Sequence, residues 1–294
     1  MRPARFSRAS SSPTISWSAR ATCSEPGLAG MSWATNGGVR IRYETAGDGP
    51  AMVLIHANPC DHRMWLYQTA RLEVRFRLLA VDLRGYGRSD KPETRYAFDE
   101  VAGDIRAAMA AEGIGRAVLM GASIGAKLAF RLAADTPDAF PALVLIGGNA
   151  FRGKSYDSRI EGYRRDGVAA YRARHLEELF APGFAATGAG RHLCGMLTDD
   201  SARLSGAAIA RLFEAFDGVD LAAEVPSLAM PILIVNGEHD LSLEGATRTA
   251  ALIPGAVHRL IPGAGHLCNL EQPAAFDALV EAFLAGHGLW PEIA

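Results

Sequence analysis

The 294 residues carry 30 basic and 32 acidic side chains, a formal net charge of −2, and 49% of them are hydrophobic. This composition is typical of a globular protein with one large core, and it excludes the strongly basic surface that binds nucleic acid or an anionic membrane. No apolar run approaches the roughly 20 residues of a membrane helix. The four cysteines are scattered, without a C-x-x-C pair or a spacing typical of a metal site. We therefore expect a soluble, cytoplasmic protein whose partners are small molecules.

Residues 1–30 differ in composition from the rest of the chain. Arginine and serine are frequent, Glu25 is the one acidic residue, and the apolar stretch of a secretory signal is missing. An Arg- and Ser-rich segment with few acids is also typical of a transit peptide. We interpret residues 1–30 as an unstructured extension and Met31 as the start of the folded part.

From residue 39 on, the chain alternates between predicted strands and helices. Residues 39–45 alternate in polarity, which predicts an antiparallel, half-exposed edge strand. Val101, Ile105 and Met109 recur at helical spacing and predict a helix over residues 98–111. Continuous apolar runs predict strands that are buried on both faces of a parallel sheet. These runs occupy residues 51–55, 78–81, 117–120 and 143–146.

The strand signal disappears between residues 151 and 225. Helical patterns over 171–180 and 207–216 are interrupted at Pro182 and at the glycine-rich residues 188–190. Strands and helices alternate again in the last part of the chain, over residues 232–235, 244–253, 257–261 and 273–284. We predict a mostly parallel, twisted sheet flanked by helices, which is an α/β fold. Its core comprises residues 31–150 and 226–294, and residues 151–225 form a helical insertion that covers one edge of the sheet.

A serine motif joins the predicted strand 117–120 to the helical pattern that begins near Lys127. Its five residues are Gly121, Ala122, Ser123, Ile124 and Gly125. Between a strand and a helix, Gly-x-Ser-x-Gly forms a strained turn that presents the serine hydroxyl outward. Ser123 is therefore the candidate nucleophile.

A serine nucleophile needs a base, and the base needs an acid to orient it. Ligands gather at the carboxyl ends of the strands in open α/β sheets, and Asp240 and His266 follow two later predicted strands. The chain order is thus serine, acid, histidine. Glu238 competes for the acid role, and the distance from Gly237 favours Asp240.

Five motifs in this order closely resemble those of the α/β-hydrolase superfamily, and the resemblance spans residues 39–286. The motifs are His56-Ala57-Asn58-Pro59 with Trp65 downstream, residues 82–89, residues 121–125, residues 237–240, and residues 262–266 followed by Glu271-Gln272-Pro273.

The resemblance implies roles for five residues. Ser123 would be the nucleophile, His266 the general base and later the acid, and Asp240 the residue that holds the imidazole. The backbone N–H groups of Ile124 and Asn58 would form the oxyanion hole. The family chemistry needs no metal and no organic cofactor. Ala57 stands where relatives commonly have glycine, which alters the expected oxyanion loop.

Other polar residues near these motifs have structural interpretations. We expect His56 to form hydrogen bonds within its turn, Asp82 and Arg84 to tie loops together, and Cys60 to be a buried, inert thiol. His239 is expected to be an ordinary loop residue.

Two related reactions are disfavoured by particular residues. Asn58-Pro59 resembles the turn of haloalkane dehalogenases, but those enzymes use an aspartate nucleophile where this chain has Ser123. Carbon–carbon hydrolases of this superfamily typically have asparagine before the serine and an aromatic residue after the histidine. Here these positions hold Ala122 and Leu267.

The predicted function is hydrolysis of a small carboxylic ester or lactone through an acyl-enzyme. Three alternatives remain open: another cofactor-free reaction of the same triad, such as perhydrolysis or a lyase-like elimination; carbon–carbon hydrolysis; and a non-catalytic ligand-binding protein on the same fold. The insertion is expected to act as a lid that sets specificity. Its first part is basic, so one of its arginines could bind a substrate carboxylate, although a solvated helix face explains the same charges.

Overall fold

The computed structural model describes residues 31–152 and 156–293, and the predicted extension at residues 1–30 lies outside the described residues. The eight strands of this part form one sheet in the order β1-β2-β4-β3-β5-β6-β7-β8. Their bounds are β1 (Met31–Asn36), β2 (Val39–Ala46), β3 (Ala51–Ile55), β4 (Arg77–Val81), β5 (Val118–Ala122), β6 (Leu143–Ile146), β7 (Ile232–Gly237) and β8 (Val257–Ile261).

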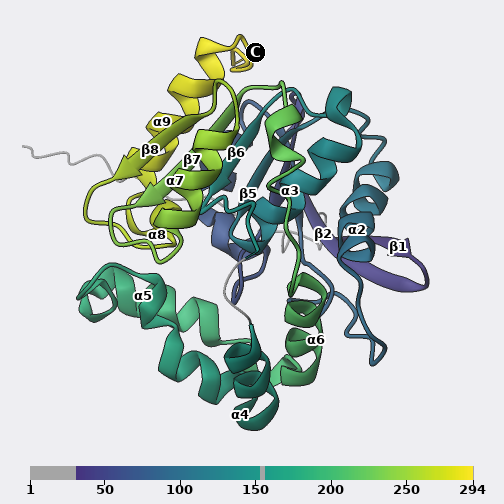
Figure 1. Cartoon of the computed structure of the whole chain (residues 1–294), viewed down its shortest axis with the longest axis vertical. Helices are drawn as coiled ribbons and strands as arrows, with labels where there is room; N and C mark the ends of the chain where they lie inside the picture. Colours follow the sequence, from purple (N-terminus) through teal and green to yellow (C-terminus); the bar gives the residue numbers. More distant parts are fainter. Residues whose placement is uncertain (1–30, 153–155, 294) are drawn as a thin grey trace, which may run out of the picture.

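The central strands run parallel, as their apolar sequences predict. β4, β3, β5, β6, β7 and β8 pair in parallel, whereas β2 pairs antiparallel with β4 and with β1. Every residue of β5, β6 and β7 is buried. Helices cover both faces (Figure 1), and the predicted α/β-hydrolase architecture is confirmed.

The prediction that residues 39–45 form an edge strand is wrong. β1 pairs with β2 along its whole length and takes the edge position. Ile41, Arg42 and Tyr43 in the middle of β2 are all buried, so its polarity pattern does not mark a solvent face. Alternating polarity indicates an antiparallel strand, but it cannot show whether a further strand pairs with it.

Alternate residues of each central strand face the two helical layers. In β3, Val53 and Ile55 belong to the core shared with α2 (Phe98–Ala111), α3 (Ile124–Asp135) and α7 (Leu243–Leu252). Met52 and Leu54 belong to the core on the other side, which is shared with α1 (Leu66–Leu72), α8 (Cys268–Glu271) and α9 (Pro273–Gly286). Two separate apolar cores therefore hold the sheet between its helices.

The described residues between β6 and β7, where the insertion is predicted, form three α-helices joined by short 3-10 turns: α4 (Asp157–His175), α5 (Gly188–Thr198) and α6 (Gly206–Phe216). Figure 1 shows them gathered on one side of the sheet, beyond the strand ends. α4 begins well before the predicted 171–180 and ends at His175, with a kink at Gly167. No helix in the described part of the chain combines the length and the apolar character of a membrane span.

The predicted break at residues 188–190 is also wrong, because α5 begins there. Thr187 caps the helix by accepting a hydrogen bond from the Gly190 N–H at 2.9 Å. A Cβ atom on Gly190 would lie 2.0 Å from the Phe184 carbonyl oxygen. Gly190 therefore serves close packing of the first turn and does not interrupt the helix.

The turn between β5 and α3 depends on two glycines that admit no side chain. A Cβ atom on Gly125 would lie 2.2 Å from the Ile55 carbonyl oxygen, and one on Gly121 would lie 2.5 Å from the Gly125 carbonyl oxygen. Both contacts are with backbone atoms, which cannot rotate away. The glycines thus allow α3 to begin directly beside β3.

We expect the Gly125→Ala variant to lose about 2 kcal/mol of unfolding free energy, because the added methyl group overpacks a rigid contact. Gly115→Ala is the matched control, since a Cβ atom at Gly115 would meet no atom within 4 Å. Urea unfolding of both variants and the wild type measures the difference. Equal midpoints for Gly125→Ala and Gly115→Ala would contradict the packing argument.

Candidate active site

The strand order reverses next to β3, which pairs with β4 on one side and with β5 on the other. Such a reversal leaves a crevice at the carboxyl ends of the strands in open α/β sheets. A cavity of about 480 Å³ lies here, and four of the five predicted site residues line it: Asn58, Ser123, Ile124 and His266. The insertion contributes Tyr156, Ser158, Arg159, Leu179 and Phe216 to the same wall.

Ser123 has a strained backbone at the end of β5. With φ 55° and ψ −110° it is the one non-glycine residue of the described chain with a positive φ. Such a conformation costs about 1–3 kcal/mol and persists where the surrounding structure enforces it. Ile124 is the first residue of α3, so its N–H has no acceptor within the helix. The turn brings both residues to the cavity wall.

His266 lies in the loop after β8, and its Nδ1 is 2.7 Å from Oδ1 of Asp240, which follows β7. Both residues are buried. His266 lines the cavity, and Asp240 lies behind it in contact with the imidazole. Burial favours the neutral form of the carboxyl group, but His266 and the hydrogen bonds from Ser242 outweigh it and lower the pKa of Asp240 to about 2. Asp240 is therefore ionised at neutral pH and can orient the imidazole.

Two further residues hold the Asp240 carboxylate in place. Ser242 donates to Oδ1 through its backbone N–H at 2.7 Å and its hydroxyl at 2.8 Å. Asn236 donates to Oδ2 at 2.7 Å, and its own side-chain oxygen is 2.9 Å from Nε2 of His258. Neither Asn236 nor Ser242 is among the site residues that the sequence predicts. The available signal was a polar residue, Asn236, at the end of an otherwise apolar strand.

Among the described residues, neither Glu238 nor the loop residue His239 forms a hydrogen bond or an ion pair with the His266 side chain. Glu238 is exposed and accepts a hydrogen bond from the Gly263 N–H at 3.0 Å. His239 is also exposed, and its N–H donates to the Ala264 carbonyl oxygen at 2.9 Å. Of the two acids that the sequence left open, the structure brings Asp240 to the imidazole.

Two tyrosine hydroxyl groups hold the side chain of Asn58, in the loop after β3. The Asn58 Oδ1 accepts hydrogen bonds from the Tyr86 hydroxyl at 2.7 Å and from the Tyr163 hydroxyl at 3.0 Å. Tyr163 belongs to α4, so this amide joins the core to the insertion. Ala57 is fully buried, and its N–H contacts the Met64 sulfur at 3.2 Å. A methyl group in place of glycine is therefore packed inside the loop.

The neighbouring polar residues have the structural contacts expected of them. The His56 Nε2 accepts from the Leu83 N–H at 3.0 Å, and its Nδ1 lies 2.9 Å from the Ala57 carbonyl oxygen. Burial lowers the pKa of His56, which fits this neutral ring. Arg84 binds Asp104 through two nitrogens at 2.6 and 2.7 Å. Burial raises the pKa of the Cys60 thiol, as for an inert cysteine.

A comparison with known protein families matches residues 50–273 to the model of the alpha/beta hydrolase fold. The chain belongs to the α/β-hydrolase family. It is 26% identical over 252 residues to 3-oxoadipate enol-lactonase 2 of Acinetobacter baylyi, covering 84% of this chain and 93% of that protein. It is 28% identical over 250 residues to 2-(acetamidomethylene)succinate hydrolase of Mesorhizobium japonicum, covering 81% of this chain and 88% of that one.

A solved structure agrees with this family assignment. The crystal structure of the enol-lactonase from Burkholderia xenovorans superposes with a TM-score of 0.81 at 28% identity, covering 86% of this chain and all of that chain (100%). The likeness therefore covers most of this chain.

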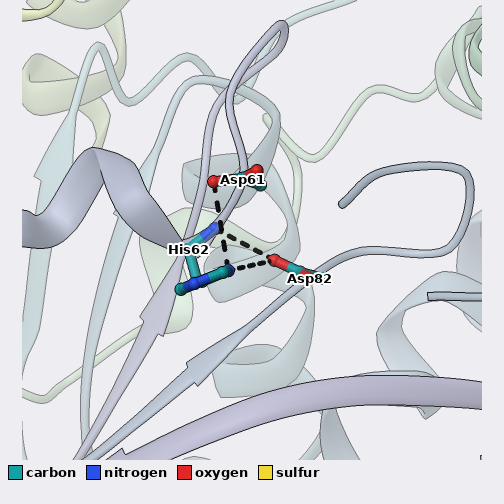
Figure 2. A group of neighbouring side chains, drawn as sticks. All are labelled: Asp61, His62 and Asp82. Carbon is teal, nitrogen blue, oxygen red and sulfur yellow. Dashed lines mark hydrogen bonds and ion pairs between the residues drawn. The ribbon is translucent and has the colours of Figure 1, made fainter. Parts of the chain in front are cut away.

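This α/β-hydrolase also has a second polar cluster, outside the residues that line the cavity. Asp61, His62 and Asp82 offer ligand atoms within 4.8 Å of one another (Figure 2), a spacing that could hold a metal ion. However, the His62 Nδ1 is 2.7 Å from Asp82 Oδ1, and Arg63 binds Asp61 at 2.9 Å. A cation would have to replace the proton that His62 shares with Asp82 and compete with Arg63 for Asp61, so we interpret the cluster as an ion-pair network.

His62 is the member of this network whose charge changes between neutral and alkaline pH. Burial by itself lowers the pKa of His62, but the hydrogen bonds to Asp82 and Glu44 outweigh it and raise the pKa to about 9. Glu44 belongs to β2 and Asp82 follows β4, so the protonated ring links two neighbouring strands.

The raised pKa predicts a pH-dependent contribution to stability. The contribution of protonated His62 to stability is complete below pH 6.5, which is the pKa of this side chain in the unfolded chain. It is lost as the pH rises through the folded-state pKa of about 9. The wild type should exceed His62→Asn in unfolding free energy by up to about 3 kcal/mol at pH 6, and by much less at pH 10. Urea titrations at both values measure this. His175→Asn, a half-exposed histidine at the end of α4, is the control, and a pH-independent gap for His62→Asn would contradict the assignment.

Proposed function

We propose that this α/β-hydrolase is a serine hydrolase that cleaves a small carboxylic ester or lactone through an acyl-enzyme on Ser123. The observation that carries the proposal is the strained Ser123 turn on the wall of a cavity that His266 also lines, with His266 held by Asp240. The enol-lactonase relatives support a small ester or lactone as substrate.

In the proposed reaction the Ser123 hydroxyl attacks the carbonyl carbon while His266 Nε2 accepts its proton. The N–H groups of Ile124 and Asn58 stabilise the negative oxygen of the tetrahedral intermediate. His266 then gives the proton to the leaving oxygen, and an acyl-enzyme remains. A water molecule, deprotonated by His266, releases the acid and restores Ser123. Asp240 stays ionised throughout and stabilises the charged imidazole.

The nucleophile is tested with p-nitrophenyl acetate and butyrate. We expect a burst of p-nitrophenol from the wild type, and a fall in kcat of about 10,000-fold or more in Ser123→Ala, because the covalent step is lost. Equal release from both proteins would refute the assignment of Ser123. Labelling that requires Ser123 but leads to no turnover would favour a ligand-binding protein.

We further propose that the insertion acts as a lid and that Arg159 selects substrates with a carboxylate. Most other arginines of the basic segment bind acidic side chains, namely Arg164 with Glu214, Arg165 and Arg174 with Asp166, and Arg172 with Asp200. Arg159 lines the cavity and takes part in no ion pair of the described residues; its guanidinium lies 5.7 Å from the Phe213 ring centre. Glu244 is the acidic residue of the cavity wall. It is exposed to solvent and forms no ion pair with Arg159 among the described residues, so it does not neutralise the guanidinium.

Paired substrates test Arg159. We expect Arg159→Met to raise KM for monomethyl adipate by about 10- to 100-fold, the loss of a hydrogen bond between charged groups, and to leave methyl hexanoate within about twofold. Arg164→Met, which removes a surface ion pair of the same helix, is the control and should change neither substrate. A uniform change for both esters in Arg159→Met would refute carboxylate selection.

A further inference from the structure

Lys127 has an unusual environment next to the candidate nucleophile. It lies in the first turn of α3, where its N–H donates to the Ser123 carbonyl oxygen at 3.2 Å. Its side chain turns away from solvent and the residue is 5% exposed. The Nζ atom donates to the carbonyl oxygens of Phe151 at 2.8 Å and Val219 at 2.9 Å. One buried ammonium group thus binds two backbone carbonyls that are far apart in sequence.

These two carbonyls belong to the two connections between the core and the insertion. Phe151 lies on the outgoing connection after β6, and Val219 on the returning connection after α6. The connections also bind each other, through the Leu221 N–H and the Ala150 carbonyl oxygen at 2.8 Å and through the Arg152 N–H and Asp220 Oδ2 at 2.9 Å. Lys127 joins this crossing point to α3.

The charge on Lys127 is not explained by an ion pair. No ion pair of the described residues includes Lys127, and the nearby Asp220 is exposed. Burying an ammonium group without a carboxylate costs free energy unless hydrogen bonds compensate for the lost water. Burial accordingly lowers the pKa of Lys127 to about 8. A methionine would fill similar space without this cost, so the hydrogen bonds are the distinctive property of lysine here.

The two hydrogen bonds from Lys127 to the connections, here called the tether, affect the substrate cavity because Lys127 itself lines this cavity. The same helix begins with Ser123 as its N-cap residue, whereas Tyr156, Arg159 and Phe216 reach the cavity from the insertion. The single helical turn between Ser123 and Lys127 is rigid. The position of the insertion's wall relative to Ser123 therefore depends on how both connections are attached to α3.

We propose that Lys127 is a positioning residue that fixes both connections of the insertion to α3 and so sets the distance between Ser123 and the insertion's cavity wall. This inference rests on the proposed hydrolase function. Lys127 takes no part in bond making or breaking. Its loss affects those substrates that reach the wall formed by Tyr156, Arg159 and Phe216, and spares substrates that occupy the space beside Ser123 alone.

The experiment compares Lys127→Met with the wild type on p-nitrophenyl acetate, which is short, and on p-nitrophenyl hexanoate, which is long enough to contact the insertion. We expect kcat/KM for the acetate to stay within about threefold, and that for the hexanoate to fall at least tenfold, mainly through KM. Lys127→Arg keeps a cationic donor and should recover most of the loss. Arg131→Met, one turn further along α3, removes the ion pairs with Asp99 and Asp135 and is the matched control.

Amide hydrogen exchange provides a readout that does not depend on activity. In Lys127→Met, protection should fall together in residues 147–152 and 217–225, and stay unchanged in α9. An unchanged acetate-to-hexanoate ratio, or a loss that affects both esters equally, would overturn the proposal, as would unchanged exchange in both connections. If Lys127→Met fails to fold, the same ratio and exchange measured on Lys127→Gln decide the matter. If the wild type turns over no ester, the proposed function fails, while the exchange measurement still tests the tether.

Discussion

The close approach of α3 to β3 is the constraint on which the candidate site depends. The helix starts so near the strand that a side chain at Gly125 would overlap the Ile55 carbonyl oxygen. The backbone must therefore reverse direction within one residue, and Ser123 takes up that reversal at φ 55°. The energy of this strain is balanced by the two apolar cores, which bury the strand before the turn and the helix after it.

A close backbone contact also positions Asp240 and His266, which lie in the loops after β7 and β8. A Cβ atom on Gly237 would lie 2.2 Å from the carbonyl oxygens of Ala264 and Gly265, so this glycine lets the loop after β8 fold back over the end of β7. Hydrogen bonding then completes the arrangement, because the Asp240 carboxylate accepts from Asn236, Ser242 and His266. Backbone contact brings the loops together, and charge orients the imidazole.

The cavity wall is formed partly by the core and partly by the insertion, and a few polar contacts join these two parts. Asn58 accepts hydrogen bonds from Tyr86 of the core and from Tyr163 of α4, and Lys127 binds the two connections of the insertion. These polar contacts are directional, whereas apolar packing alone would allow the insertion to slide. A buried polar group is costly when its partner leaves, so each contact favours one position of the insertion over its neighbours.

The sequence alone determined the parallel core strands, the Ser123 turn and the order of Ser123, Asp240 and His266, because apolar runs and fixed spacings are local signals. The tertiary structure decided features that depend on partners distant in sequence. These are the edge position of β1, the start of α5 at Gly188, the attachment of Asn58 and Lys127 to the insertion, and the exposure of Arg159 to the cavity. A residue's own neighbours in sequence carry no information about such contacts, since packing between separate segments creates them.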